Sequence, residues 1–176
     1  VGHIYGLGVA GYWGSTIEIE AVVHPLGNRE KGTIHFNDTA GSMARDSVTN
    51  ASSVVRMITG KNLSDYDVYV NVVGGGNIDG PSAGAAITCA IISALTGKPL
   101  RQDIAVTGEI SLSGRIKPVG GIAEKAFGAH QGGMKAILIP KQNAPDMGSE
   151  YMHMKVIPVD TIQDILEHML VRKNRK

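Results

Sequence analysis

One stretch of mostly small and apolar residues, Ala85 to Leu95, most constrains how this chain can fold. Its residues are small and apolar around nearly the whole helical circumference, which predicts a helix buried on all sides. Gly97 and then Pro99 follow in the order typical of a helix end. The segment before it, Asp67 to Val73, is β-branched and aromatic, which predicts a strand. A core strand, a short connection and a buried helix therefore organise the rest of the chain.

The connection ends in Asp79-Gly80-Pro81-Ser82-Ala83-Gly84. Pro81 suits a first helical position, because its missing N–H would have no partner inside the helix. Ser82 then falls in the first turn, where N–H groups lack helical acceptors and the local field favours negative charge. A hydroxyl there could attack a carbonyl, and the nearby N–H groups could receive the oxyanion. A serine that only caps the helix fits the same hexapeptide, so a nucleophile needs a base elsewhere in the chain.

The composition limits the classes of protein to consider. The 176 residues are 43% hydrophobic and 19% charged, which predicts one globular domain, residues 1–176, with a real core. A formal net charge of +1 argues against a nucleic-acid surface, and no apolar run reaches the roughly 18 residues of a membrane span. The single cysteine fits a reducing compartment, so we expect a cytoplasmic protein. The start at Val1-Gly2, without Met, predicts a piece of a longer chain.

Hydrophobic periodicity predicts an α+β fold with a mixed sheet and flanking helices. A strand over 16–23 is expected to form a hairpin with a strand over 32–36. The expected strands and hairpin further along are 68–73, 104–107, the hairpin 109–118 around Ser113-Gly114, 136–140 and 155–159, and the expected helices are 42–59, 85–95, 122–130 and 161–170.

A histidine is one candidate for the missing base. The spacing Gly-x-Ser-x-Gly around Ser82 matches the nucleophile elbow of α/β-hydrolases. In an elbow the strand runs straight into the serine turn, whereas here seven residues, 74–80, lie between them. An acid and then a histidine do occur downstream, for example Asp146 and His153. A Ser-His esterase is therefore an alternative, although not the one that the spacing favours.

Other chemistries have weaker support in the sequence. Cys89 lies in the middle of the expected buried helix, where packing in the core explains it. The six histidines are scattered without metal-ligand spacing on an expected helix, so we predict no metal site. The glycine run Gly74-Gly75-Gly76 lacks the G-x-G-x-x-G frame, and the chain has no P-loop, so we expect no cofactor in it.

Lys125 is the other candidate base. It falls in the first turn of the helix expected after Gly120-Gly121, among the small or apolar neighbours Ile122, Ala123 and Ala126. A cation at this end of a helix opposes the helix dipole, and burial would lower its pKa further. A lysine of ordinary pKa is only about 0.4% neutral at pH 8, and a downward shift of about 2–3 units would make most of it a usable base. Periodicity alone favours a surface lysine on an amphipathic helix.

Four motifs in order resemble the proteolytic domain of the Lon family of ATP-dependent proteases. The nucleophile motif of that family is matched by 79–84, and its Thr-Gly-Glu hairpin by 107–116. The segment that carries its lysine is matched by 119–125, and the strand that follows by 137–143. The similarity is densest from Asp79 to Asn143 and extends over the whole chain.

The resemblance implies roles for single residues. Ser82 corresponds to the catalytic serine and Lys125 to the catalytic lysine of a Ser-Lys dyad. Thr107 corresponds to a threonine that orients the lysine, and Asp79 to an acidic residue that influences opening of the active site. The implied fold is similar to domain 2 of ribosomal protein S5.

The resemblance also implies an assembly and partners. Members of the family form hexameric rings that degrade misfolded and regulatory proteins, fed by an AAA+ ATPase domain on the same chain. ATP and magnesium would then belong to that absent domain, and this fragment would hold no cofactor and contact neither nucleic acid nor membrane.

The sequence departs from many bacterial relatives around the nucleophile. Those proteins carry histidines in the strand before it and a Pro-Glu-Gly loop, whereas this chain has Tyr69, Asn71 and the glycine-rich loop 73–76. The departure leaves the subtype open. A non-catalytic assembly or binding module of the same fold is the remaining alternative, and the presence of both dyad residues counts against it.

Overall fold

The computed structural model describes residues 1–10, 13–28, 31–36, 42–73 and 81–172, without the side chains of Ala10 and of residues 42–45. The helices are α1 (Ser42–Thr59), α2 (Gly84–Thr96), α3 (Ile122–Gln131) and α4 (Ile162–Met169), and the 3₁₀ turns are η1 (Leu63–Asp65), η2 (Pro81–Ala83) and η3 (Lys141–Asp146). The strands are β1 (His3–Ala10), β2 (Trp13–Pro25), β3 (Ile34–Phe36), β4 (Tyr66–Val73), β5 (Ile104–Val106), β6 (Glu109–Ile110), β7 (Ile116–Lys117), β8 (Ala136–Pro140), β9 (Glu150–Tyr151) and β10 (Met154–Val159).

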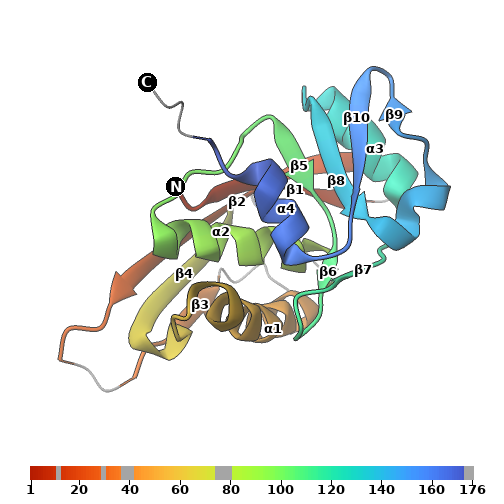
Figure 1. Ribbon diagram of the computed structural model, residues 1–176. Coiled ribbons are helices and arrows are strands. Elements are labelled where there is room, and N and C mark those ends of the chain that lie inside the picture. Colours follow the sequence, from red (N-terminus) through yellow and green to blue (C-terminus); the bar gives the residue numbers. More distant parts are fainter. Residues whose placement is uncertain (11–12, 29–30, 37–41, 74–80, 173–176) are drawn as a thin grey trace.

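In the described part of the chain, eight strands form one mixed sheet in the order β3-β4-β2-β1-β5-β8-β10-β9, and β6 and β7 form a separate hairpin (Figure 1). Strands β1, β5, β8 and β10 run parallel, whereas β2 is antiparallel to both of its neighbours, β1 and β4. The fold is thus α+β with a mixed sheet and flanking helices, as predicted. The closer likeness to the S5 domain stays a prediction.

The hairpin expected between residues 16–23 and 32–36 is wrong. Strand β2 is longer than expected and is paired along one edge with β1 and along the other with β4. Because both of its edges are occupied, β3 adds to the free edge of β4 instead and runs parallel to it, with His35 opposite Tyr69.

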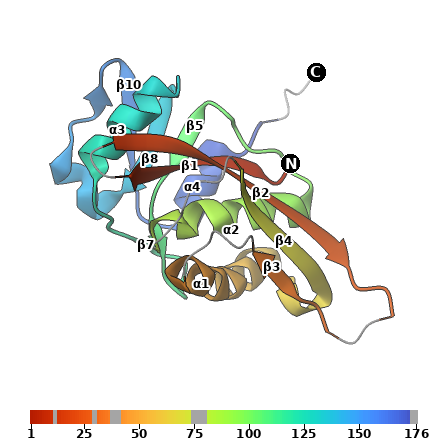
Figure 2. The same cartoon turned by 180° about the vertical axis from the view of Figure 1, so that it is seen from behind.

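Two hydrophobic clusters lie on opposite faces of the sheet. The larger cluster packs the sheet against α2, with α1 and α4 beside that helix, and the smaller one packs it against α3 (Figures 1 and 2). Strand β8 serves both, since Leu138 belongs to the larger cluster and Ile137 and Ile139 to the smaller. This strand is therefore apolar at every position, as expected for a strand covered on both faces.

Helix α2 is the central helix, and it is as buried as its sequence predicts. All but two of its thirteen residues are buried, and Gly97 ends it in the left-handed conformation, with a φ of 67°. None of the described helices is both long and apolar enough to cross a membrane.

Candidate active site

A pocket of about 480 Å³ opens where the carboxyl ends of parallel strands β1 and β5 meet. Such an edge is a common place for a ligand site in a sheet with parallel strands. The pocket is lined by Val9, Pro81, Ser82, Glu109, Pro118, Val119, Gly120, Gly121, Glu124 and Lys125. The two residues predicted to form a dyad, Ser82 and Lys125, therefore face the same cavity, although 43 positions of sequence separate them.

Ser82 lies in the 3₁₀ turn η2, directly before α2. The turn is held to Gly108 by two backbone hydrogen bonds, because Gly108 N–H donates to the Ser82 carbonyl at 3.0 Å and Ala85 N–H donates to the Gly108 carbonyl at 3.0 Å. A methyl group at Gly108 would lie only 2.6 Å from Ile116 Cγ2, so the close contact requires glycine. Ser82 is thus fixed to the segment that joins β5 and β6.

The structure contradicts the interpretation of Ser82 as a helix cap. The N-cap of α2 is Ala83, and no side-chain hydrogen bond caps this helix. Ser82 is half-buried, and its hydroxyl makes no hydrogen bond to another described residue. Pro81 begins the 3₁₀ turn rather than the α-helix.

Lys125 is buried rather than a surface lysine. It lies in the first turn of α3, whose N-cap is Gly121, and its backbone N–H donates to the Gly121 carbonyl at 2.9 Å. Only 4% of the residue is exposed. Burial lowers the pKa of Lys125 from 10.5 to about 8, and the neighbouring charge of Glu124 opposes this change. The amine is therefore neutral in a large fraction of molecules at mildly alkaline pH.

Among the described residues, Ser82 and Lys125 are not hydrogen-bonded to each other. Hydrogen bonds of an active site are often long or unformed before substrate binds. Thr107 is fully buried, and its Oγ1 finds no hydrogen-bond partner among the described residues. A buried hydroxyl without a partner costs free energy unless another state of the site satisfies it.

The histidine alternative fails on geometry. Asp146 accepts a hydrogen bond from the side chain of Asn143 at 2.9 Å, and the side chain of His153 is 99% exposed at the turn between β9 and β10. Neither residue lines the pocket of Ser82. The pair that the sequence offered for a Ser-His esterase is therefore not assembled.

The remaining candidate residues from the sequence are Cys89 and Asp79, and the sequence predicted no metal site. Cys89 is fully buried in α2, and burial raises the pKa of its thiol to about 12, so it is a packing residue. No group of three or more His, Cys, Asp or Glu side chains in the described ranges is arranged to hold a metal ion. Asp79 and the glycine-rich loop 74–80 lie outside the described residues.

Sequence reasoning did not assign roles to Val9, Glu109 and Glu124, which also line the pocket. The only signal for Glu109 was its place in the Thr-Gly-Glu motif. No signal in the sequence pointed to Val9, because an apolar residue at the end of a strand is usual.

Comparisons with known proteins show the family of this chain. The family described as the Lon protease (S16) C-terminal proteolytic domain matches residues 1–172. The chain is 35% identical to the archaeal Lon protease of Pyrococcus abyssi, over 100% of this chain and 18% of that protein. It is 37% identical to the archaeal Lon protease of Archaeoglobus fulgidus, over 99% and 30%, and 38% identical to Lon protease 2 of Bacillus subtilis, over 97% and 33%.

The chain is therefore similar throughout to proteolytic domains, and proteolytic domains are hydrolases. The chain belongs to the family of Lon proteolytic domains. It spans between about a fifth and a third of the length of the three relatives described.

Proposed function

We propose that this chain is the proteolytic domain of an ATP-dependent Lon-type protease and cleaves peptide bonds with a Ser-Lys dyad. Ser82 is the nucleophile and Lys125 the general base. The observation that carries the proposal is a buried lysine with a pKa lowered to about 8 in the same pocket as a serine free of any capping role. Perturbed titratable groups in a cleft are typical of functional sites.

The reaction begins with proton transfer. At pH 8 a lysine of pKa about 8 is roughly half neutral, about a hundred times the neutral fraction of an ordinary lysine. Neutral Lys125 takes the hydroxyl proton of Ser82 while the serine oxygen attacks the peptide carbonyl carbon. Backbone N–H groups at the start of the helix, with help from the glycine-rich loop 74–80, stabilise the oxyanion.

The second half of the reaction returns the enzyme to its starting state. The ammonium of Lys125 gives its proton to the leaving amine, and the acyl group stays on Ser82. Lys125 then takes a proton from a water molecule whose oxygen attacks the ester carbonyl, and it gives that proton to the Ser82 oxygen as the acid is released. The water-poor surroundings of Lys125 favour its neutral form at each step that needs a base.

Thr107 has a positioning role in this proposal. Its buried and unpaired Oγ1 supports an acceptor function toward the Lys125 ammonium, formed when the dyad closes on substrate. Asp79 is proposed to influence opening of the site.

The functions of the whole protein are also proposals. They rest on membership of the Lon family, and they are proposals because this chain covers only part of each relative's length. We propose that residues 1–176 form one proteolytic domain, that it assembles as a homo-hexamer in the cytoplasm, and that an AAA+ ATPase domain on the same chain uses ATP and magnesium to deliver misfolded and regulatory proteins. The fragment itself is proposed to act without a cofactor.

The test is cleavage of casein, an unstructured protein, followed by mass spectrometry. Ser82→Ala and Lys125→Met are expected to reduce cleavage at least about a thousandfold, because each removes one reacting group. Lys125→Arg keeps the charge but supplies no free base near neutral pH, so it should be equally inactive. The exposed residues Ser149 and Lys155 provide the matched controls Ser149→Ala and Lys155→Arg, which should cleave like the unmodified chain.

The outcomes separate the proposal from its rivals. Substantial cleavage by Ser82→Ala would refute the nucleophile, and cleavage by Lys125→Arg would refute the base. If the unmodified fragment is inactive, the same variants are compared in the full-length protein with ATP. Absence of cleavage there as well would favour a non-catalytic assembly module.

A further inference from the structure

Helix α3 and strand β2 meet through their backbones rather than through side chains. A methyl group at Gly14, in β2, would lie 1.7 Å from the carbonyl oxygen of Glu124 and 2.9 Å from the backbone nitrogen of Lys125. A methyl group at Gly128, one turn further along α3, would lie 2.3 Å from the carbonyl carbon of Gly14. Because backbone atoms cannot move aside like a flexible side chain, both positions require glycine at this spacing.

The point of closest approach is the peptide that joins Glu124 to Lys125. Helix α3 packs on β2 and β1 at this place (Figure 2). Gly14 therefore contacts the part of the helix from which the Lys125 side chain enters the pocket. The depth at which Lys125 is buried depends directly on how closely α3 approaches β2.

Ser82 is fixed independently of this contact. It belongs to η2, which is bonded to Gly108 on the segment after β5. The distance between the serine oxygen and the lysine nitrogen is therefore set by two separate attachments, one at Gly108 and one at Gly14 and Gly128. Only the contact at Gly14 and Gly128 acts on α3, the helix that carries Lys125.

We propose that Gly14 and Gly128 are positioning residues of the active site, whose contact holds α3 against β2 so that the Lys125 amine meets Ser82 in a water-poor pocket. The inference rests on the proposed roles of Ser82 and Lys125. The charged groups that line the pocket with Lys125 are Glu109 from β6 and Glu124 from α3, among the described residues.

An added methyl group at either glycine should lift α3 and admit water to Lys125. Since burial is the main cause that lowers the pKa of this lysine, exposure should raise the pKa back toward 10.5. The acid limb of the pH–activity profile, on which activity rises with pH, then moves to higher pH. At a given pH on that limb, each unit of the shift lowers the rate about tenfold.

The experiment uses Gly14→Ala and Gly128→Ala in the full-length protein, numbered as in this chain. Two variants are matched controls. Gly132→Ala changes the C-cap of the same helix, where the nearest atom to the added methyl would be Thr16 Cγ2, a side-chain atom at 2.7 Å, and the nearest backbone atom the Gly128 oxygen, at 3.3 Å. Gly27→Ala has nothing within 4 Å. All proteins are assayed with a peptide substrate from pH 6 to 10 in trimethylamine N-oxide, which favours the folded state, and folding is followed by circular dichroism.

The expected result is a fall in kcat of about tenfold or more at pH 7.5, with KM within about twofold, an acid limb at least about one unit higher, and recovery of rate near pH 10. The two controls should keep the profile of the unmodified protein. An unchanged acid limb in folded Gly14→Ala and Gly128→Ala would overturn the proposal, and so would an equal effect of Gly132→Ala. Failure of both variants to fold in the osmolyte would show the contact to be structural and would also overturn it.

Failure of the proposed function would look different. In that case the unmodified protein would be inactive, or Ser82→Ala would remain active, whatever the glycine variants do.

Discussion

At the scale of single residues, Lys125 shows what periodicity could and could not reveal. The sequence placed it in the first turn of a helix among small or apolar neighbours, and periodicity alone favoured a surface lysine. Burial decides between the two, and it depends on the glycine contact with a strand more than a hundred positions away in sequence. Local patterns carry no information about such a contact.

Burial of Lys125 should lower the stability of the fold at neutral pH. A native pKa of about 8 against 10.5 for the free group means that the unfolded chain binds this proton more tightly. Stability therefore rises with pH between these two values, and the full cost, about 3 kcal/mol, applies below pH 8. Lys125→Met should raise the free energy of unfolding by about that amount at pH 6.5, and the gain should shrink toward pH 10.5.

Urea denaturation at pH 6.5 and at pH 10 measures this difference. Lys155→Met, at an exposed position, is the control and should stay within about 0.5 kcal/mol. A gain for Lys125→Met that is the same at both pH values would contradict the electrostatic explanation.

At the scale of elements, those with strong local signals were predicted, including the buried strands β5, β8 and β10, whereas β1 and the pairing of β3 with β4 were not. The helix α1, the hairpin of β6 and β7 and the buried helix α2 are confirmed close to their expected bounds. Strand β1 was not predicted, because Gly6 and Gly8 interrupt its β-propensity. A methyl group at Gly8 would meet the far end of the Ile17 side chain, with Cδ1 at 2.4 Å.

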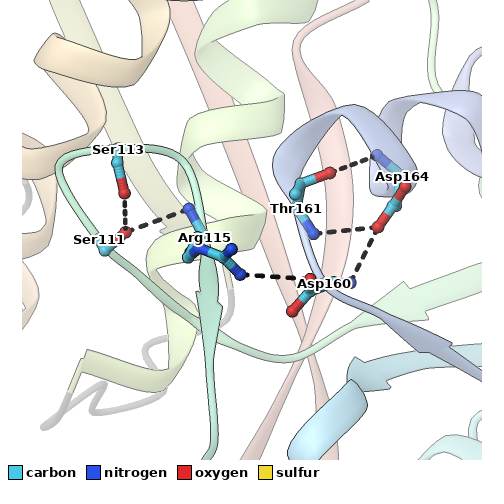
Figure 3. A network of polar contacts seen from close by, with 6 residues as sticks. All are labelled: Ser111, Ser113, Arg115, Asp160, Thr161 and Asp164. Carbon is cyan, nitrogen blue, oxygen red and sulfur yellow. Dashed lines mark hydrogen bonds and ion pairs between the residues drawn. The ribbon is translucent and has the colours of Figure 1, made fainter.

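A polar network surrounds the start of α4 (Figure 3). The hydroxyl of Thr161 accepts from Asp164 N–H at 3.2 Å, and the Asp164 carboxylate accepts from Thr161 N–H at 3.1 Å, which together form a capping box. Backbone bonds from Ile162 to Gly114 and from Ile116 to Asp160 join this cap to the β6–β7 hairpin. The cap thus helps to hold the hairpin whose other end carries Glu109 into the pocket.

Thr161→Ala should destabilise the fold by about 1 kcal/mol, because it removes the acceptor for a helix N–H. Arg115→Ala removes an exposed ion pair to Asp160 at 3.3 Å and should cost less than about 0.5 kcal/mol. Thermal denaturation of both variants at pH 7 checks the ranking, and a larger loss for Arg115→Ala would contradict it.

The same cap should weaken in acid. Hydrogen bonds from the backbone N–H of Asp160 and from Thr161 lower the pKa of Asp164 below its usual 3.8. Its contribution is therefore complete above that value and is lost as pH falls through the lowered pKa. A titration of stability below pH 4 should show this loss in the native chain but not in Asp164→Asn.

At the scale of the whole molecule, the two halves of the proposed dyad stand on elements that are packed to different extents. Helix α2, next to Ser82, packs against the sheet on one side and between α1 and α4 on the other. Helix α3, which carries Lys125, covers the other face with the smaller cluster. Topology of this kind follows from long-range pairing, so the sequence predicted the class of fold and not this asymmetry.

Native-state hydrogen exchange should reveal the asymmetry. Amides in the middle of α2 and in β8 are expected to exchange only through global unfolding, whereas those of α3 should exchange through a smaller opening of lower free energy. Equal protection of α2 and α3 at several denaturant concentrations would contradict this expectation.

The burial of Cys89 has a practical consequence. A fully buried thiol with a pKa raised to about 12 is almost unreactive toward maleimides and iodoacetamides while the protein is folded. A second cysteine introduced at an exposed site, such as Leu112 at the hairpin tip, would then take a fluorophore or spin label alone. The natural sequence is thus already suited to site-specific labelling, and its only cysteine need not be replaced first.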